Sequence, residues 1–97
     1  PVMDGETLEV YRWGAYNAND YTAPTGLDVE LVDGSEVVQT AANTRNTQDK
    51  TAPVASYQNT TGNPQVFQLR AKNDTGSTIG GGTGDAGIGM HYGVQVV

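Results

Sequence analysis

The sequence has no cysteine, a single histidine and no apolar run longer than three residues. Without cysteine there are no disulfides, thiolate metal sites or cysteine nucleophiles. One histidine cannot form a histidine-based metal cluster, and the short apolar runs exclude a transmembrane helix. Lysine and arginine total only 5 against 11 acids, and the net charge of −6 argues against a nucleic-acid partner. These absences remove most enzyme classes, so we expect no enzyme and no cofactor.

The 97 residues support one domain, spanning residues 1–97. The acids are scattered and only two lysines are present, which is typical of a hydrated surface that stays soluble at high salt. No basic segment followed by an apolar run opens the sequence, so no secretory signal is visible. We therefore expect a complete small gene product.

The apolar residues alternate with a period of two, which is typical of half-buried strands. Asp33-Gly34 between two such segments predicts a hairpin. The expected strands cover residues 6–13, 27–31, 36–40, 53–58, 66–72 and 90–97. The fold predicted is all-β, a single antiparallel sandwich of jelly-roll or immunoglobulin-like type, with about seven to eight short strands. In the strand at 27–31, Asp28 and Glu30 are expected to face water.

The alternation also predicts which segments lie outside the core. Residues 1–5 are expected to form an N-terminal arm, and residues 15–26 and 73–89 two long loops. The second loop contains seven of the 13 glycines. Residues 41–52 form a third polar connection. The predicted core consists of Leu8, Val10, Leu27, Val29, Leu31, Val38, Tyr57, Phe67, Leu69, Tyr92, Val94 and Val96.

The glycine-rich loop carries two motifs that suggest ligands. Gly82, Gly84 and Gly87 match G-x-G-x-x-G, but a dinucleotide site needs a helix after that motif, and here a strand pattern follows. Calcium takes oxygen ligands, so Asp74 and Asp85 are the candidate ligands if the loop binds a cation. We expect no resident metal.

The remaining polar residues give little indication of a catalytic site. His91 lies on the terminal strand with no nucleophile in a recognisable context, so we interpret it as a surface or satisfied histidine. Asn59 and Asn73 begin Asn-x-Thr triplets, which are glycosylation acceptors only if the protein meets that machinery.

Four aromatic residues lie close together in the sequence, at Tyr11, Trp13, Tyr16 and Tyr21. They could pack in the core, with Tyr11 and Trp13 sharing one strand face, anchor a protein interface, or stack on sugars. The candidate interface residues are Pro1, Val2, Met3, Tyr16 and Tyr21.

The segments GLDVELVDGSEVVQ, ASYQNTTGNPQVFQLRAKNDTG and MHYGVQVV resemble pre-peptidase C-terminal domains, small jelly-roll sandwiches beside secreted peptidases. Such modules carry no catalytic residues, so none is transferred. This resemblance implies an extracellular module that binds carbohydrate or protein.

The size and the acidic, lysine-poor, threonine-rich composition also resemble the small β-sandwich virion proteins, capsid decoration or turret proteins, of haloarchaeal tailed viruses. This resemblance implies a non-enzymatic structural protein at the virion surface. It would decorate or stabilise a capsid through self-association into a homo-oligomer and contacts with the major capsid protein. Neither nucleic acid nor membrane is an expected partner. The extracellular binding module is the alternative.

Overall fold

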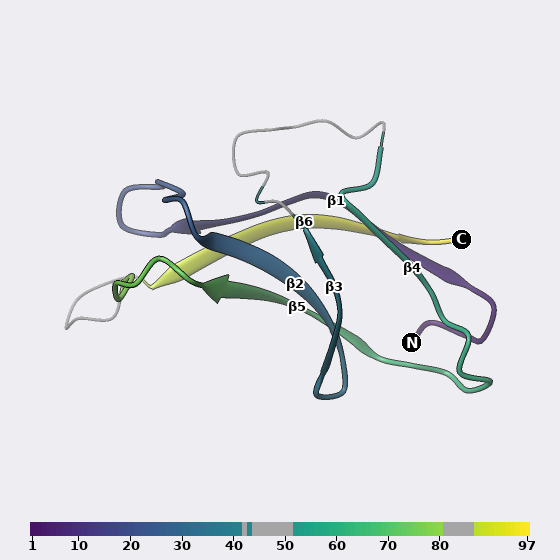
Figure 1. Cartoon of the computed structure of the whole chain (residues 1–97). Helices are drawn as coiled ribbons and strands as arrows, with labels where there is room; N and C mark the ends of the chain where they lie inside the picture. Colours follow the sequence, from purple (N-terminus) through teal and green to yellow (C-terminus); the bar gives the residue numbers. More distant parts are fainter. Residues whose placement is uncertain (42, 44–51, 81–86) are drawn as a thin grey trace.

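The computed structural model describes residues 1–41, 43, 52–80 and 87–97 (Figure 1). Over these residues the chain forms six strands in two three-stranded antiparallel sheets. One sheet has the order β4 (Ala55–Gln58), β1 (Thr7–Asn17), β6 (Ile88–Val96). The other has the order β3 (Glu36–Ala41), β2 (Leu27–Asp33), β5 (Phe67–Asn73). The central strands β1 and β2 pack against each other, which confirms the predicted all-β, sandwich-like fold.

The strands number six in this described part, not the seven to eight expected. Each of the six segments with alternating apolar residues forms a strand. The additional strands follow from the usual strand number of a sandwich and have no segment of their own in the sequence. The predicted loops are also shorter. β1 continues to Asn17, into the expected loop at 15–26, and β6 already begins at Ile88. No helix in the described ranges is long and apolar enough to cross a membrane.

The β2–β3 hairpin forms where Asp33-Gly34 predicted it. Asp33 pairs with Glu36, so the loop consists of Gly34 and Ser35. Gly34 has a φ of 63°, in the left-handed region that glycine adopts without steric cost. Tight two-residue hairpins require such positive φ angles, which is why the Asp-Gly signal was informative.

A β-bulge in β1 determines which of its side chains face the core. The pairing of β1 with β6 shifts between Tyr11 and Gly14, leaving one extra residue in β1, and Arg12 adopts a φ of 51°. An extra residue reverses the alternation of side chains between the two faces. The buried apolar residues before and after the bulge are Leu8, Val10, Trp13 and Ala15. Tyr11 and Trp13 therefore do not share a face, contrary to expectation.

Of the predicted core residues, five are buried and four are partly buried against the core. For the other three the prediction is wrong, because they are exposed. The buried ones are Leu8, Val10, Leu27, Val29 and Leu31. Val38, Tyr57, Phe67 and Leu69 pack against them. Tyr92, Val94 and Val96, all in β6, are 53%, 53% and 44% exposed.

The exposure of β6 has a geometric cause. Val94 pairs with Val10, and Val96 with Leu8. Directly paired residues point to the same face of a sheet, so these valines point toward the core side. β6 is nevertheless the outermost strand of its sheet, and in the described residues no strand of the other sheet packs closely against it. The sandwich is thus open along β6.

The N-terminal residues are part of the fold. Val2 exchanges two backbone hydrogen bonds with Gln65, at 2.8 and 2.9 Å, and is only 6% exposed. At Val2 the predicted N-terminal arm is therefore paired with its own chain and buried. Pro1 and Met3 remain exposed.

Asn43, from the polar connection after β3, joins the two sheets. Its Oδ1 accepts a hydrogen bond from the backbone N–H of Ala15 at 3.1 Å. Its Nδ2 donates to the carbonyl of Ala15 at 2.9 Å and to that of Leu27 at 2.8 Å. One side chain therefore ties the end of β1 to the start of β2.

Replacing Trp13 tests the corrected core. Trp13 is fully buried, and its Nε1 donates to the Met90 sulfur at 3.1 Å. We expect Trp13→Ala to lower the free energy of unfolding by about 3–5 kcal/mol, because a large cavity remains. Tyr21→Ala, which changes a 62% exposed ring, should change it by less than about 0.5 kcal/mol. Urea denaturation followed by circular dichroism measures both, and similar losses for the two variants would contradict this core.

Candidate functional site

An apolar groove follows the open side of the sandwich between β6 and β5. Tyr92, Val94 and Val96 line it from β6, Phe67 and Leu69 from β5. The lining is completed by Pro1, Val2, Leu8, Gln65 and Val66. The groove encloses about 250 Å³ and none of its lining residues has a charged side chain. We call this surface the β6 groove.

The backbone of β6 is also available on this side. Thr7 and Val97 exchange two hydrogen bonds, at 2.7 and 2.9 Å. In an antiparallel pair such residues alternate with residues whose N–H and C=O groups point away from the partner strand. Going back along β6, the outward-pointing groups therefore belong to Val96, Val94 and Tyr92. The residues that expose apolar side chains are the same ones that expose hydrogen-bonding groups.

This edge lacks the usual protection against pairing. Natural sheets protect exposed edges with charged residues, prolines or short strands. β6 has nine residues, and residues 87–97 include no Asp, Glu, Lys, Arg or Pro. The β6 edge is therefore suited to accept another strand.

On the opposite face of this sheet, three rings form a row. The ring centroids of Tyr21 and Tyr16 are 5.6 Å apart, and those of Tyr16 and His91 are 6.2 Å apart. Tyr16 pairs with Gly89 across the strands, and a Cβ at that glycine would collide with the Tyr16 ring. Tyr21 is 62% exposed at a φ of 60°. We call these three rings the aromatic row.

The structure thus brings together two of the four aromatics singled out in the sequence. Tyr16 lies in β1 and not in a loop. Trp13 belongs to the core, and Tyr11 donates a hydrogen bond to Glu9 Oε1 at 3.0 Å, which raises the pKa of Tyr11. His91, which sequence reasoning left as a surface or satisfied residue, is half-buried and joins the row. Its Nδ1 hydrogen-bonds the carbonyl of Arg12, and so carries the proton, because a carbonyl only accepts.

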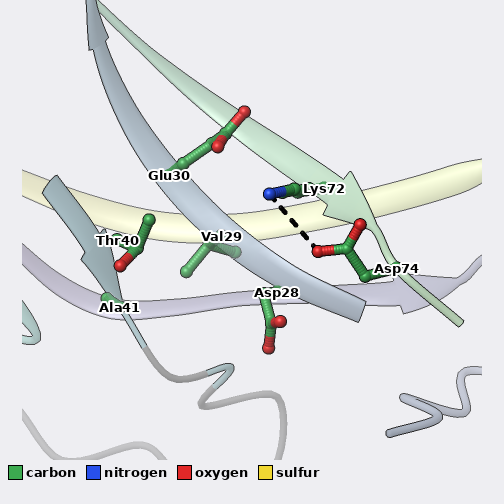
Figure 2. Close-up of a pocket in the computed structure, with 7 residues that line it drawn as sticks. All are labelled: Asp28, Val29, Glu30, Thr40, Ala41, Lys72 and Asp74. Carbon is green, nitrogen blue, oxygen red and sulfur yellow. Dashed lines mark ion pairs between the residues drawn. The ribbon is translucent and has the colours of Figure 1, made fainter. Parts of the chain in front are cut away.

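A second hollow, of about 330 Å³, lies over β2 and its neighbours, and its lining includes three acids, Asp28, Glu30 and Asp74 (Figure 2). Lys72 Nζ lies 3.3 Å from Asp74 Oδ2. Glu30 is 5% exposed, contrary to the expectation that it faces water, and its Oε1 lies 2.6 Å from an Arg70 guanidinium nitrogen. Two of the acids lining this hollow, Glu30 and Asp74, are thus paired with bases from β5.

The calcium hypothesis gains no support from this hollow. Asp74 is already paired with Lys72, and Asp85 lies outside the described residues, as do Gly82 and Gly84 of the rejected dinucleotide motif. In the described part of the chain, no three His, Asp or Glu side chains are grouped so that they could hold a metal ion.

The two Asn-x-Thr triplets form the same turn. In each, the Asn Oδ1 accepts hydrogen bonds from the N–H and the hydroxyl of the Thr two residues later. In each, the Asn Nδ2 donates to the carbonyl four residues later. A glycine with positive φ, Gly62 or Gly76, follows the Thr. Asp20 and Thr22 repeat the first part of this arrangement, and the hydrogen bonds from Thr22 lower the pKa of Asp20.

This turn explains the triplets as structural elements. Asn59 is fully buried and its Nδ2 also donates to the carbonyl of Val2 at 2.9 Å. The nitrogen that would carry a glycan is therefore enclosed and already bonded. Asn73 is exposed. Sequence reasoning missed the role of Asn59, although the repeated Asn-x-Thr-Gly pattern was a visible turn signal.

Asn59 and Asn73 provide a matched pair for measuring the value of burial. We expect Asn59→Ala to lower the free energy of unfolding by about 2–3 kcal/mol, because it leaves buried polar groups without partners. Asn73→Ala removes the same turn bonds in water and should cost about 0.5–1 kcal/mol. Denaturant titration measures both, and equal losses would show that burial of Asn59 contributes nothing.

Comparison with known proteins finds no match among family models, curated proteins or solved structures. A function for this chain must therefore be argued from its own residues.

Proposed function

We propose that this protein is a non-enzymatic structural protein that works by binding other protein chains at the β6 edge and the β6 groove. The observation that carries the proposal is the combination of unpaired strand edge and uncharged apolar groove in the same residues, Tyr92, Val94 and Val96. Strand addition uses both, because main-chain hydrogen bonds supply affinity and alternate side chains enter pockets.

The dimensions of the groove favour a protein partner over a small molecule. Sites for small ligands usually enclose about 300–1,000 Å³ and contain a few placed polar groups. The β6 groove encloses about 250 Å³, and its only polar side chains are those of Gln65 and Tyr92. Side chains of another chain would fill such a shallow apolar surface.

The acidic surface supports a role in a repeated assembly at high salt. The chain carries −6, and 11 acids are spread along its length. Copies of a protein with the same net charge repel one another where their charged surfaces meet, but not where their uncharged surfaces meet. Together with the composition that resembles haloarchaeal virion proteins, this supports decoration or stabilisation of a capsid at the virion surface, through contacts with the major capsid protein.

Two tyrosines allow a matched test of this function. Tyr92→Lys adds a charge to the β6 groove, and Tyr21→Lys adds the same charge to the aromatic row; the two tyrosines are 53% and 62% exposed. We expect the wild type to co-sediment with capsids assembled without it, and Tyr92→Lys to weaken this binding about tenfold or more. Tyr21→Lys should bind as the wild type does. No binding by the wild type, or full binding by Tyr92→Lys, would overturn the proposal.

The aromatic row favours a second candidate, an extracellular carbohydrate-binding module. Sugars stack on exposed aromatic faces, and Tyr21 offers one beside Tyr16. If this is the function, Tyr21→Ala should abolish glycan-array binding of the wild type. Tyr92→Ala should leave that binding unchanged, because Tyr92 lies in the groove on the other face. Absence of glycan binding by the wild type would exclude this candidate.

A further inference from the structure

We propose that the occupant of the β6 groove is a second copy of this chain. The two β6 strands pair antiparallel about a two-fold axis at Val94, joining two three-stranded sheets into one of six strands. This inference rests on the proposed function, because it names the partner of the same edge.

Charge favours a second copy at this edge. Two chains of −6 each repel wherever their acids face one another. The lining of the β6 groove contains no Asp or Glu, and residues 87–97 contain none either. Two copies that meet along β6 therefore place an uncharged surface against an uncharged surface, with no acid opposite an acid in the strand pair.

The register of β6 is compatible with pairing to itself. A two-fold axis requires each residue to contact its counterpart reciprocally. With Val94 on the axis, Tyr92 of one copy lies opposite Val96 of the other, and Val96 opposite Tyr92. All three have their N–H and C=O groups directed outward, so each of these positions is a hydrogen-bonded pair.

The same symmetry covers the exposed side chains. A two-fold axis perpendicular to the sheet keeps the core-facing sides of both copies on one side. The two β6 grooves then form one continuous trough, closed on its flanks by β5 of each copy. Tyr92, Val94 and Val96, which are exposed in the single chain, become the interior of the joined sandwich.

The axis at Val94 sets the length of the contact. Because Tyr92 lies opposite Val96, His91 lies opposite Val97, and residues 91–97 form the paired stretch. At about 3.4 Å per residue this stretch is roughly 24 Å long.

A single cysteine tests the axis directly, because the chain has none of its own. Paired residues in a hydrogen-bonded antiparallel position have Cα atoms about 5.5 Å apart, within the range that a disulfide spans. We expect Val94→Cys to form a covalent dimer on mild oxidation, seen on a non-reducing gel. Val37→Cys, at a 41% exposed valine on the edge strand β3, should stay a monomer on that gel. Equal cross-linking of the two variants would overturn the proposed axis.

Lysine at the same positions tests the association without a covalent bond. In sedimentation equilibrium, the wild type should have a molecular mass twice the chain mass of 10.2 kDa. Val94→Lys, which brings two like charges together at the axis, should raise the dissociation constant at least tenfold, whereas Val37→Lys should leave it unchanged. A monomeric wild type, or a dimeric Val94→Lys, would overturn the inference. A monomeric wild type that still binds capsids through Tyr92 would leave the proposed function standing, whereas a dimer that ignores capsids would remove that function alone.

Discussion

The bulge at Arg12 is the constraint on which the rest of the first sheet depends. Without the extra residue, strict alternation from Leu8 and Val10 would direct Arg12 into the core and Trp13 into solvent. With it, Trp13 is fully buried and bonded to Met90. The positive φ of Arg12 is sterically unfavourable for a residue with a side chain, and burial of the largest side chain in the protein offsets it.

The bulge also determines which side chains lie on each of the two faces of the sheet. Beyond it, Gly14 and Tyr16 point outward, so the paired positions His91 and Gly89 point outward with them. That alignment builds the aromatic row. On the core-facing side of the sheet, the alternation of β6 places Tyr92, Val94 and Val96 where the other sheet does not pack closely against them. These three exposed side chains line the β6 groove. One extra residue in β1 thus separates an aromatic surface from an apolar one.

The features of the fold that depend on neighbouring residues could be predicted from the sequence. Alternation located all six strands, and Asp33-Gly34 located the hairpin, because pleating and turn geometry depend on near neighbours. The exposure of Val94 could not be predicted in this way. Its pattern is that of a core valine, and only its place in the outermost strand leaves it uncovered. The bulge at Arg12 had no glycine to signal it, and the burial of Asn59 depends on Val2, 57 residues away.

The sequence pattern therefore could not distinguish the residues of the candidate site from core residues. Tyr92, Val94 and Val96 have the pattern of core residues, and they line a core-like surface, but one that the chain leaves open. β6 is held on one side by its pairing with β1, by the Trp13–Met90 contact and by the bond from His91 to Arg12. Its other side is thereby kept extended in the single chain. A strand that is already ordered loses less conformational entropy on pairing than a flexible segment does. An edge that combines this order with apolar side chains and no charge is better suited to permanent assembly than to transient contact.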